Sequence, residues 1–226
     1  LLLGVSGTSQ ERNISLASPT KVELSCKLDK NSHLKSPQVT WQRGSETISH
    51  TRKTENSWSI QLSIMDSSAL GSYSCILKGE VEFRAVFHLQ VPKIEAKEKP
   101  VITYIGDAAV MLCKTDYPSM AWTWYMTNGS KQVAINDSLR ADKYLINRQS
   151  ANSTRLKILQ LTKEDSGLYW CEAAFQLGMS KGKFELKVLS IMAPLKPFLA
   201  IVVEVAIFVT TIFLYELYSK RKEKSA

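Results

Sequence analysis

One carboxylate, Glu204, lies deep inside an apolar segment near the end of this 226-residue sequence. The segment begins at Pro197, reads PFLAIVVEVAIFVTTIFLYELYS, and is followed by the basic cluster KRKEK. A run of about 20 apolar residues is long enough to cross the hydrocarbon core of a membrane as one helix. A carboxylate at that depth costs roughly 2.5 to 3.5 kcal/mol on insertion scales. The chemistry that Glu204 offers is therefore a charge inside hydrocarbon, and we expect a partner that compensates it.

The helical repeat places six further residues on the side of Glu204. At spacings of three, four, seven and eleven residues from it, they are Ala200, Ile201, Ile207, Phe208, Thr211 and Tyr215. A rise of about 1.5 Å per residue puts Glu204 roughly 9 Å below Phe198, in the outer half of the hydrocarbon. Small and polar residues permit close approach and hydrogen bonding between membrane helices. We predict that these seven residues, the Glu204 stripe, contact a membrane partner; the plainer alternative is that the apolar ones face lipid.

The charges beside the span predict its orientation. Lys220, Arg221, Lys222 and Lys224 follow it directly, whereas only Lys196 lies close on its other side. The positive-inside rule then places the C-terminus in the cytoplasm and the preceding chain outside the cell. We expect a single-pass type I protein of the plasma membrane. The tail, residues 219–226, is too short to fold by itself and has no tyrosine, so we interpret it as a stop-transfer anchor.

The remaining reactive side chains do not suggest catalysis. The histidines, His33, His50 and His88, are scattered without metal-ligand spacing, and no glycine-rich phosphate loop is present. The sequence therefore predicts no enzyme, no metal and no cofactor. The formal charge of +8 does not indicate nucleic acid, because the charged segment faces the outside and lacks a nucleic-acid-binding motif.

Four cysteines divide between two similar segments; they are Cys26, Cys75, Cys113 and Cys171. An even set in an oxidising compartment indicates disulfide bonds, and spacing alone leaves three pairings open. In both segments a tryptophan follows the first cysteine, and a glycine and a tyrosine precede the second. These residues are Trp41, Gly71 and Tyr73, and then Trp124, Gly167 and Tyr169. The pattern returns after about 95 residues, which is an internal repeat.

Cysteine, tryptophan, and tyrosine two residues before a second cysteine are typical of immunoglobulin domains. The resemblance implies the bridges Cys26 to Cys75 and Cys113 to Cys171, each joining the two sheets of one sandwich. We predict an all-β ectodomain of two tandem immunoglobulin-like β-sandwiches followed by a single transmembrane α-helix. The expected segments are 9–92, 93–190, a juxtamembrane linker 191–197, the helix 198–218 and the tail. Residues 1–8 are left out as the remnant of a signal peptide or an expression vector.

The two repeats differ near the second cysteine. In the second repeat Asp165 precedes Gly167, and we expect it to form an ion pair with Lys143. Ala69 occupies the equivalent position in the first repeat, so that ion pair cannot form there. The interval between the cysteines is also shorter in the first repeat. We therefore expect the first domain to have fewer strands and to be the less stable one.

Four Asn-x-Ser/Thr sequons lie in the segment predicted to face the outside. They begin at Asn13, Asn128, Asn136 and Asn152. Such sequons are acceptors for N-linked glycans in secreted segments. We expect them to be glycosylated, which would cover much of the second domain, where three of the four lie.

The membrane segment resembles that of the basigin, neuroplastin and embigin family. The matching residues are Pro197, Phe198, Leu199, Ile201, Val202, Glu204, Val205, Ile212, Phe213, Tyr215 and Glu216, and the cluster Trp122, Thr123, Trp124 and Tyr125 is similar too. The resemblance implies an ancillary subunit that binds monocarboxylate transporters, the carriers of lactate and pyruvate, and escorts them to the plasma membrane.

By the same resemblance the ectodomain takes part in cell adhesion, and the intramembrane Glu204 contacts the carrier. The alternative is a cell-adhesion receptor with a passive membrane anchor. Glu204 distinguishes the two, because a passive anchor gains nothing from an acid inside the membrane. The expected partners are thus a multi-pass monocarboxylate transporter, membrane lipid and adhesion ligands.

Overall fold

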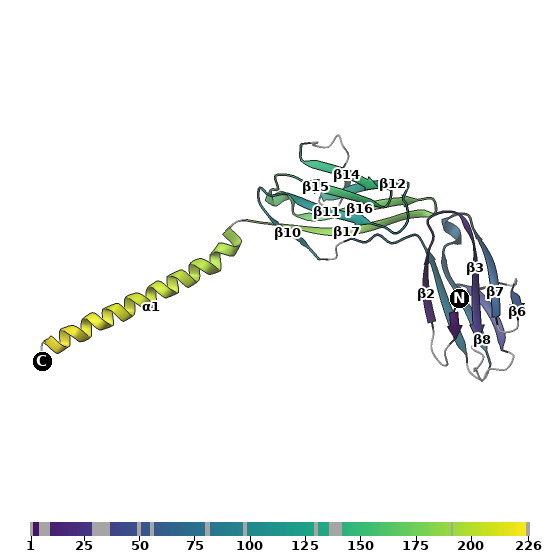
Figure 1. Ribbon diagram of the computed structural model, residues 1–226, viewed down its shortest axis with the longest axis horizontal. Coiled ribbons are helices and arrows are strands. Elements are labelled where there is room, and N and C mark those ends of the chain that lie inside the picture. Colours follow the sequence, from purple (N-terminus) through teal and green to yellow (C-terminus); the bar gives the residue numbers. More distant parts are fainter. Residues whose placement is uncertain are drawn as a thin grey trace.

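The computed structural model describes residues 2–4, 10–28, 37–48, 51–54, 57–79, 82–96, 99–128, 131–135, 142–190 and 192–224. Two β-sandwiches follow one another along the chain, and one long helix leaves the far end of the second (Figure 1). The predicted fold class is confirmed: two immunoglobulin-like sandwiches precede a C-terminal helix.

The first sandwich packs a four-stranded sheet, in the order β1-β3-β7-β6, against a five-stranded sheet, in the order β2-β9-β8-β4-β5. Its strands are β1 (Leu2–Gly4), β2 (Gln10–Ser15), β3 (Thr20–Leu28), β4 (Gln38–Arg43), β5 (Glu46–Ile48), β6 (Arg52–Thr54), β7 (Ser57–Ile64), β8 (Gly71–Lys78) and β9 (Phe83–Gln90). β1 lies in the segment that the sequence prediction left out, yet it pairs in parallel with the end of β3. An added edge strand thus extends the smaller sheet.

The second sandwich packs a three-stranded sheet, in the order β11-β15-β14, against a five-stranded sheet, in the order β10-β17-β16-β12-β13. Its strands are β10 (Val101–Tyr104), β11 (Ala109–Lys114), β12 (Ala121–Asn128), β13 (Lys131–Ile135), β14 (Tyr144–Ser150), β15 (Ser153–Ile158), β16 (Gly167–Phe175) and β17 (Gly178–Leu189). The predicted break between the domains falls between β9 and β10.

The expectation that the first domain has fewer strands is wrong for the described residues. Four strands lie between the bridge strands of each sandwich, β4 to β7 in the first and β12 to β15 in the second. β5 and β6 have three residues each, whereas β13 and β14 have five and seven. The shorter interval between the cysteines therefore shortens strands instead of removing one.

Each core is built around a disulfide and a buried tryptophan. The disulfides are Cys26–Cys75 and Cys113–Cys171, with Cα atoms 6.6 and 6.7 Å apart. Trp41 and Trp124 are fully buried, and each ring packs on a phenylalanine with ring centroids 5.9 Å apart. The tryptophan lies opposite the second cysteine of its own sandwich in the strand register. The repeat in the sequence is thus a repeat of the core.

The hydrogen bonding of these two tryptophans differs. Trp124 Nε1 donates to the hydroxyl of Thr154 over 3.1 Å, and Thr154 lies opposite Cys113. In the first sandwich Trp58 takes the place opposite Cys26, and Trp41 Nε1 has no acceptor among the described residues. A buried donor without a partner costs about 1 to 3 kcal/mol. The prediction that the first domain is the less stable one stays a prediction, because buried donors without a partner among the described residues occur in the second domain too, Trp170 Nε1 among them.

The segment between the domains packs onto the second core. Val91, Ile94 and Ala96 of this segment do so, and Ala17, between β2 and β3 of the first domain, packs there too. Glu95 exchanges two backbone hydrogen bonds with Lys114, of 2.8 and 3.1 Å, and Gln176 N donates to Ala17 O over 3.1 Å. The connection is therefore anchored along the second sandwich up to Ala96.

Gly182 allows this segment to approach the disulfide. It lies opposite Cys171, and a Cβ atom there would be 3.0 Å from Cys171 Sγ, Ala96 Cβ and Ile94 Cγ2. Overpacking of a filled core typically costs about 1 to 3 kcal/mol. We expect Gly182→Ala to lower the thermal unfolding midpoint of the second domain. Adding Ala96→Gly should recover part of the loss, and an unchanged midpoint in Gly182→Ala would refute the contact.

Candidate functional site

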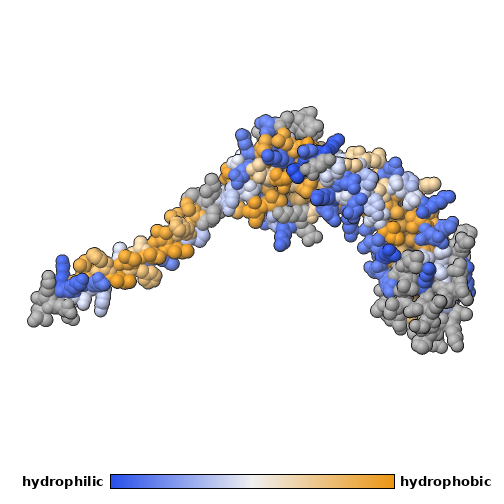
Figure 2. Space-filling view, in the orientation of Figure 1, coloured by the Kyte–Doolittle hydropathy of each residue, from blue (hydrophilic) through white to orange (hydrophobic). Residues whose placement is uncertain are grey.

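The Glu204 stripe lies on one long helix, α1 (Met192–Lys224). Its segment Leu195–Arg221 is long and apolar enough to cross a membrane, and Figure 2 shows an apolar rod with a polar C-terminal end. The helix is longer than the predicted 198–218, since it includes most of the expected linker and extends through the tail to Lys224. Leu, Lys, Arg and Glu are good helix formers, and extending a formed helix needs no new nucleation.

The continuous helix brings the predicted stripe together. At 3.6 residues per turn, all seven residues lie within about 60° of the direction of Glu204 around the axis. Their side chains are exposed. Glu204 thus lies at the centre of a helix face that no other described part of the chain covers.

The hydroxyls of two threonines are bound within the helix. Thr211 Oγ1 donates to the carbonyls of Ile207 and Phe208, at 3.0 and 2.8 Å. Thr210 Oγ1 makes the same contacts one residue earlier, at 2.8 and 2.9 Å. Thr211 can therefore hydrogen-bond a partner only as an acceptor, because its hydroxyl proton is already donated within the helix. Only Thr211 belongs to the stripe, so the pair differs in helix face alone.

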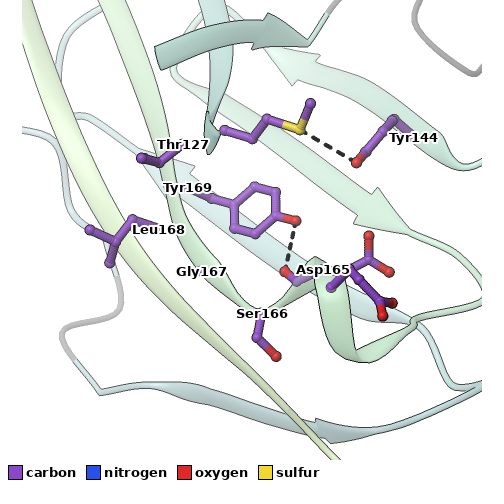
Figure 3. Close-up of a pocket in the computed structure, with 9 residues that line it drawn as sticks. Thr127, Tyr144, Asp165, Ser166, Gly167, Leu168 and Tyr169 are labelled. Carbon is purple, nitrogen blue, oxygen red and sulfur yellow. Dashed lines mark hydrogen bonds between the residues drawn. The ribbon is translucent and has the colours of Figure 1, made fainter. Parts of the chain in front are cut away.

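A pocket of about 210 Å³ lies at the end of the second sandwich (Figure 3). It is lined by Met126, Thr127, Tyr144, Glu164, Asp165, Ser166, Gly167, Leu168 and Tyr169. Tyr144 donates to the sulfur of Met126 over 3.5 Å, and Tyr169 donates to the carbonyl of Asp165 over 3.0 Å. Ligand pockets usually exceed about 300 Å³. This cavity is small, and its tyrosine hydroxyls already serve the fold.

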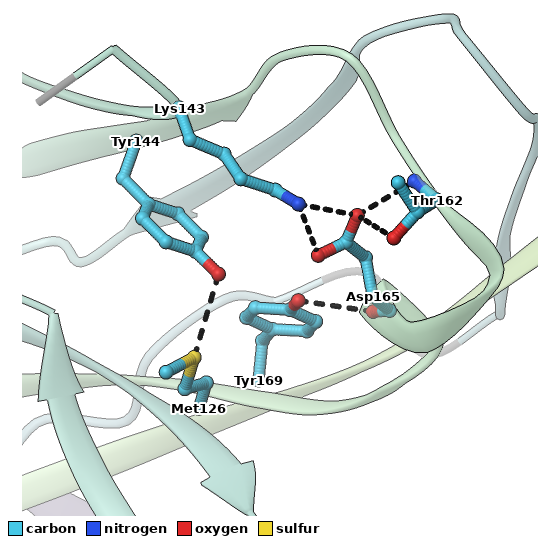
Figure 4. A network of polar contacts seen from close by, with 6 residues as sticks. All are labelled: Met126, Lys143, Tyr144, Thr162, Asp165 and Tyr169. Carbon is cyan, nitrogen blue, oxygen red and sulfur yellow. Dashed lines mark hydrogen bonds and ion pairs between the residues drawn. The ribbon is translucent and has the colours of Figure 1, made fainter. Parts of the chain in front are cut away.

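The carboxylate beside this pocket forms the predicted ion pair (Figure 4). Lys143 Nζ lies 2.7 Å from Asp165, which also accepts hydrogen bonds from the backbone N and the hydroxyl of Thr162. Burial raises the pKa of Asp165, but these hydrogen bonds outweigh it and hold the pKa below its usual value. Burial raises the pKa of Tyr169. A permanently charged acid and a permanently neutral phenol hold a corner of the fold and offer no proton near neutral pH.

The first domain closes the equivalent corner with an arginine. Tyr73 donates to the carbonyl of Ala69 over 2.8 Å, the same contact that Tyr169 makes with Asp165. Arg43 donates to the carbonyls of Ser68 and Leu70 and lies 5.6 Å from the centre of the Tyr73 ring. The sequence did not predict this contact, because every residue has a backbone carbonyl and the acceptors therefore cannot be recognised by residue type.

One outer sheet face of the second domain carries a ladder of aromatic and charged side chains, also missed from the sequence. It consists of Tyr125, Trp170, Glu172, Lys181 and Lys183. Glu172 accepts a hydrogen bond from Tyr125 and pairs with Lys181, both over 3.1 Å. The two lysines lie 5.3 and 5.6 Å from the rings of Tyr125 and Trp170. Residues along β12, β16 and β17 alternate between this face and the core. This alternation in the sequence could have identified the ladder residues.

The other predicted site residues are dispersed. Asn13 is exposed on β2, and Asn152 is half-buried in the turn between β14 and β15. Asn128 ends β12, and Asn136 lies outside the described residues, as do His33 and His50. His88 contacts the Ser72 hydroxyl over 2.8 Å and lies 3.6 Å from Glu11. The described residues contain no group of acids, histidines or cysteines that could hold a metal.

Comparisons with known proteins agree with this architecture. The family model "Immunoglobulin domain" matches residues 91–174. Embigin of Homo sapiens is 42% identical over 95% of this chain, and embigin of Mus musculus is 43% identical over 96%. The chain spans 67% and 68% of these two relatives. Identity at this level over almost the whole sequence decides the family. The chain belongs to the embigin family.

Basigin is a more distant relative of this embigin-family chain. The Mus musculus protein is 30% identical over 87% of the chain, which spans 51% of that relative. Both relatives lie in the broader family that the membrane segment resembles. This embigin-family chain is a non-enzymatic immunoglobulin-superfamily protein, and one C-terminal helix of membrane-spanning length follows its two domains.

Proposed function

We propose that the chain is an ancillary subunit of a monocarboxylate transporter in the plasma membrane. It contacts the carrier through the Glu204 stripe and supports the carrier's delivery to the cell surface. Its two domains lie outside the cell, its basic C-terminus is cytoplasmic, and its sequons carry glycans. Membership in the embigin family supports this proposal, together with the resemblance of the membrane segment to that of the wider family.

The observation that carries the proposal is the position of Glu204. An ionisable residue inside a membrane helix is expensive and usually faces a protein partner or a water-filled cavity. Glu204 lies at the centre of an exposed face of α1, and no other described segment of this chain is suited to cross the membrane beside it, so we assign its partner to another protein. A multi-pass carrier can offer hydrogen-bond donors at that depth, whereas lipid tails cannot.

We expect Glu204→Leu to weaken association with the carrier. Membrane hydrogen bonds average about 0.6 kcal/mol, and charge-assisted ones are stronger. At least about threefold less carrier should then co-purify, since 1.4 kcal/mol corresponds to tenfold. Glu204→Gln should have a milder effect because an amide keeps some of the hydrogen bonding. The measurements are co-purification from mild detergent and the carrier's surface level, at matched expression.

The control for this experiment is Val202→Leu, which lies about 160° around the helix from Glu204. A second matched pair is Thr211→Val and Thr210→Val, because both hydroxyls make the same bonds within the helix. Only the Thr211 variant should affect the carrier. Equal co-purification and equal surface carrier for wild type and Glu204→Leu would refute the proposal.

A second candidate function, an adhesion receptor with a passive anchor, is supported by the ladder on the outer sheet face. Tyrosine and tryptophan side chains are enriched in protein interfaces. Trp170 Nε1 is buried and has no acceptor among the described residues. If adhesion is the main function, Trp170→Ala should abolish cell aggregation, while Glu204→Leu leaves surface carrier levels unchanged.

A further inference from the structure

The second domain has an apolar patch at the end from which α1 leaves. It consists of Ile102, Tyr104, Ile105 and Leu189, whose exposed fractions are 62%, 38%, 42% and 37%. β10 pairs in parallel with β17, which places Tyr104 opposite Leu189, and Ile105 N donates to Leu189 O over 3.0 Å. We call these four residues the basal patch.

The chain keeps the basal patch close to the membrane. β17 ends at Leu189, α1 begins at Met192, and the segment suited to cross a membrane begins at Leu195. From Met192 to the apolar run at Phe198, a helix rises about 9 Å at 1.5 Å per residue. The headgroup layer is about 5 to 8 Å thick on each side of the hydrocarbon core. The end of β17 therefore lies at the outer boundary of the headgroups.

No other described part of the chain covers the basal patch. The first domain contacts the second at the opposite end of the sheet, through Ala17 with Gln176 and Val91 with Gly178. Figure 1 shows β10 at the end of the second sandwich from which α1 leaves. An uncovered edge strand with outward apolar residues invites unwanted pairing, and proteins normally cover or charge such edges.

The chemistry of the patch suits a lipid surface. Tyrosine is enriched at membrane interfaces, where its ring contacts apolar groups and its hydroxyl meets water. The neighbouring Lys187 and Glu185 pair over 3.1 Å, so they bring little net charge to this edge. The exposed Asp107 follows closely in the turn after β10, and its charge limits the depth to the headgroup layer.

We propose that the basal patch lies in the headgroup layer of the membrane that α1 crosses. The second domain then rests with its β10 edge against lipid instead of standing free on a tether. This contact is independent of the proposed carrier, and it limits the orientations in which both domains face the outside.

The test uses the full chain in phosphatidylcholine vesicles, with no carrier present. A nitroxide label is attached at Ile102→Cys or, as control, at Met179→Cys, an exposed residue at the opposite end of β17. Saturation measurements give the label's accessibility to oxygen, which partitions into lipid, and to a water-soluble nickel chelate. We expect the oxygen-to-nickel ratio to be at least about threefold higher at Ile102 than at Met179.

The additional substitution Ile105→Asp should bring the ratio at Ile102 down to the control value. Because Ile105 is exposed, unfolding midpoints should stay unchanged, which separates lost contact from lost folding. Equal ratios at Ile102 and Met179 in the vesicles would overturn the proposal. Protection of Ile102 only after a monocarboxylate carrier is added would overturn it too, since the patch would then be a protein contact.

Discussion

The pair of substitutions Cys113→Ala and Cys171→Ala is expected to unfold the second domain well below the wild-type midpoint. Loss of a native disulfide from a small domain typically costs about 2 to 5 kcal/mol. For a domain of this size each kcal/mol shifts the midpoint by about 4 to 8 °C. We therefore expect the unfolding midpoint of the second domain to fall by roughly 10 to 30 °C. Hydrogen exchange resolved along the chain should locate the loss of protection in that domain. In cells the chain should be retained in the endoplasmic reticulum.

The matched control removes the other bridge, with Cys26→Ala and Cys75→Ala. It should loosen the first domain and leave exchange in β10 to β17 largely unchanged. If either pair of substitutions unfolds both sandwiches, they form one cooperative unit. Separately, cleavage of the wild type within 91–100 should release two fragments without reductant, because each bridge stays within its own sandwich.

Asp165→Asn is expected to cost about 3 to 5 kcal/mol, because removing one partner of a buried pair leaves the other charge uncompensated. Side chains of Lys143 and Asp165 are only 12% and 8% exposed. The thermal midpoint of the second domain measures the loss. The neighbouring Glu164→Gln is the control, and it should have little effect because Glu164 is exposed.

The same residue predicts a dependence on pH. The pKa of Asp165 is lower in the folded state than its usual value, so unfolding raises it. The stabilisation is then fully present above the unfolded pKa of about 3.9 and is lost as the pH falls through the lower folded pKa. The gap between wild type and Asp165→Asn should therefore narrow in acid. A gap that stays constant down to the lowest measurable pH would contradict this assignment.

The parts of the fold that depend on residue type and spacing could be predicted from sequence. The repeated cysteine, tryptophan and tyrosine pattern predicts both cores. The position of Asp165 two residues before Gly167 predicts its ion pair with Lys143. The Glu204 stripe follows from helical spacing alone. The place of Trp58 opposite Cys26 depends instead on strand register. The basal patch depends on parallel pairing of β10 with β17, which are distant in the sequence, so no local pattern indicates it.

The hydroxyl of Thr154 has a consequence for the order of events during biosynthesis. Thr154 is the third residue of the sequon at Asn152, and it is fully buried with its oxygen bound to the indole of Trp124. An enzyme that reads this sequon must reach that hydroxyl, and in the folded sandwich it cannot. If Asn152 carries a sugar chain, it must be attached while the nascent chain is still open, before β15 closes over Trp124.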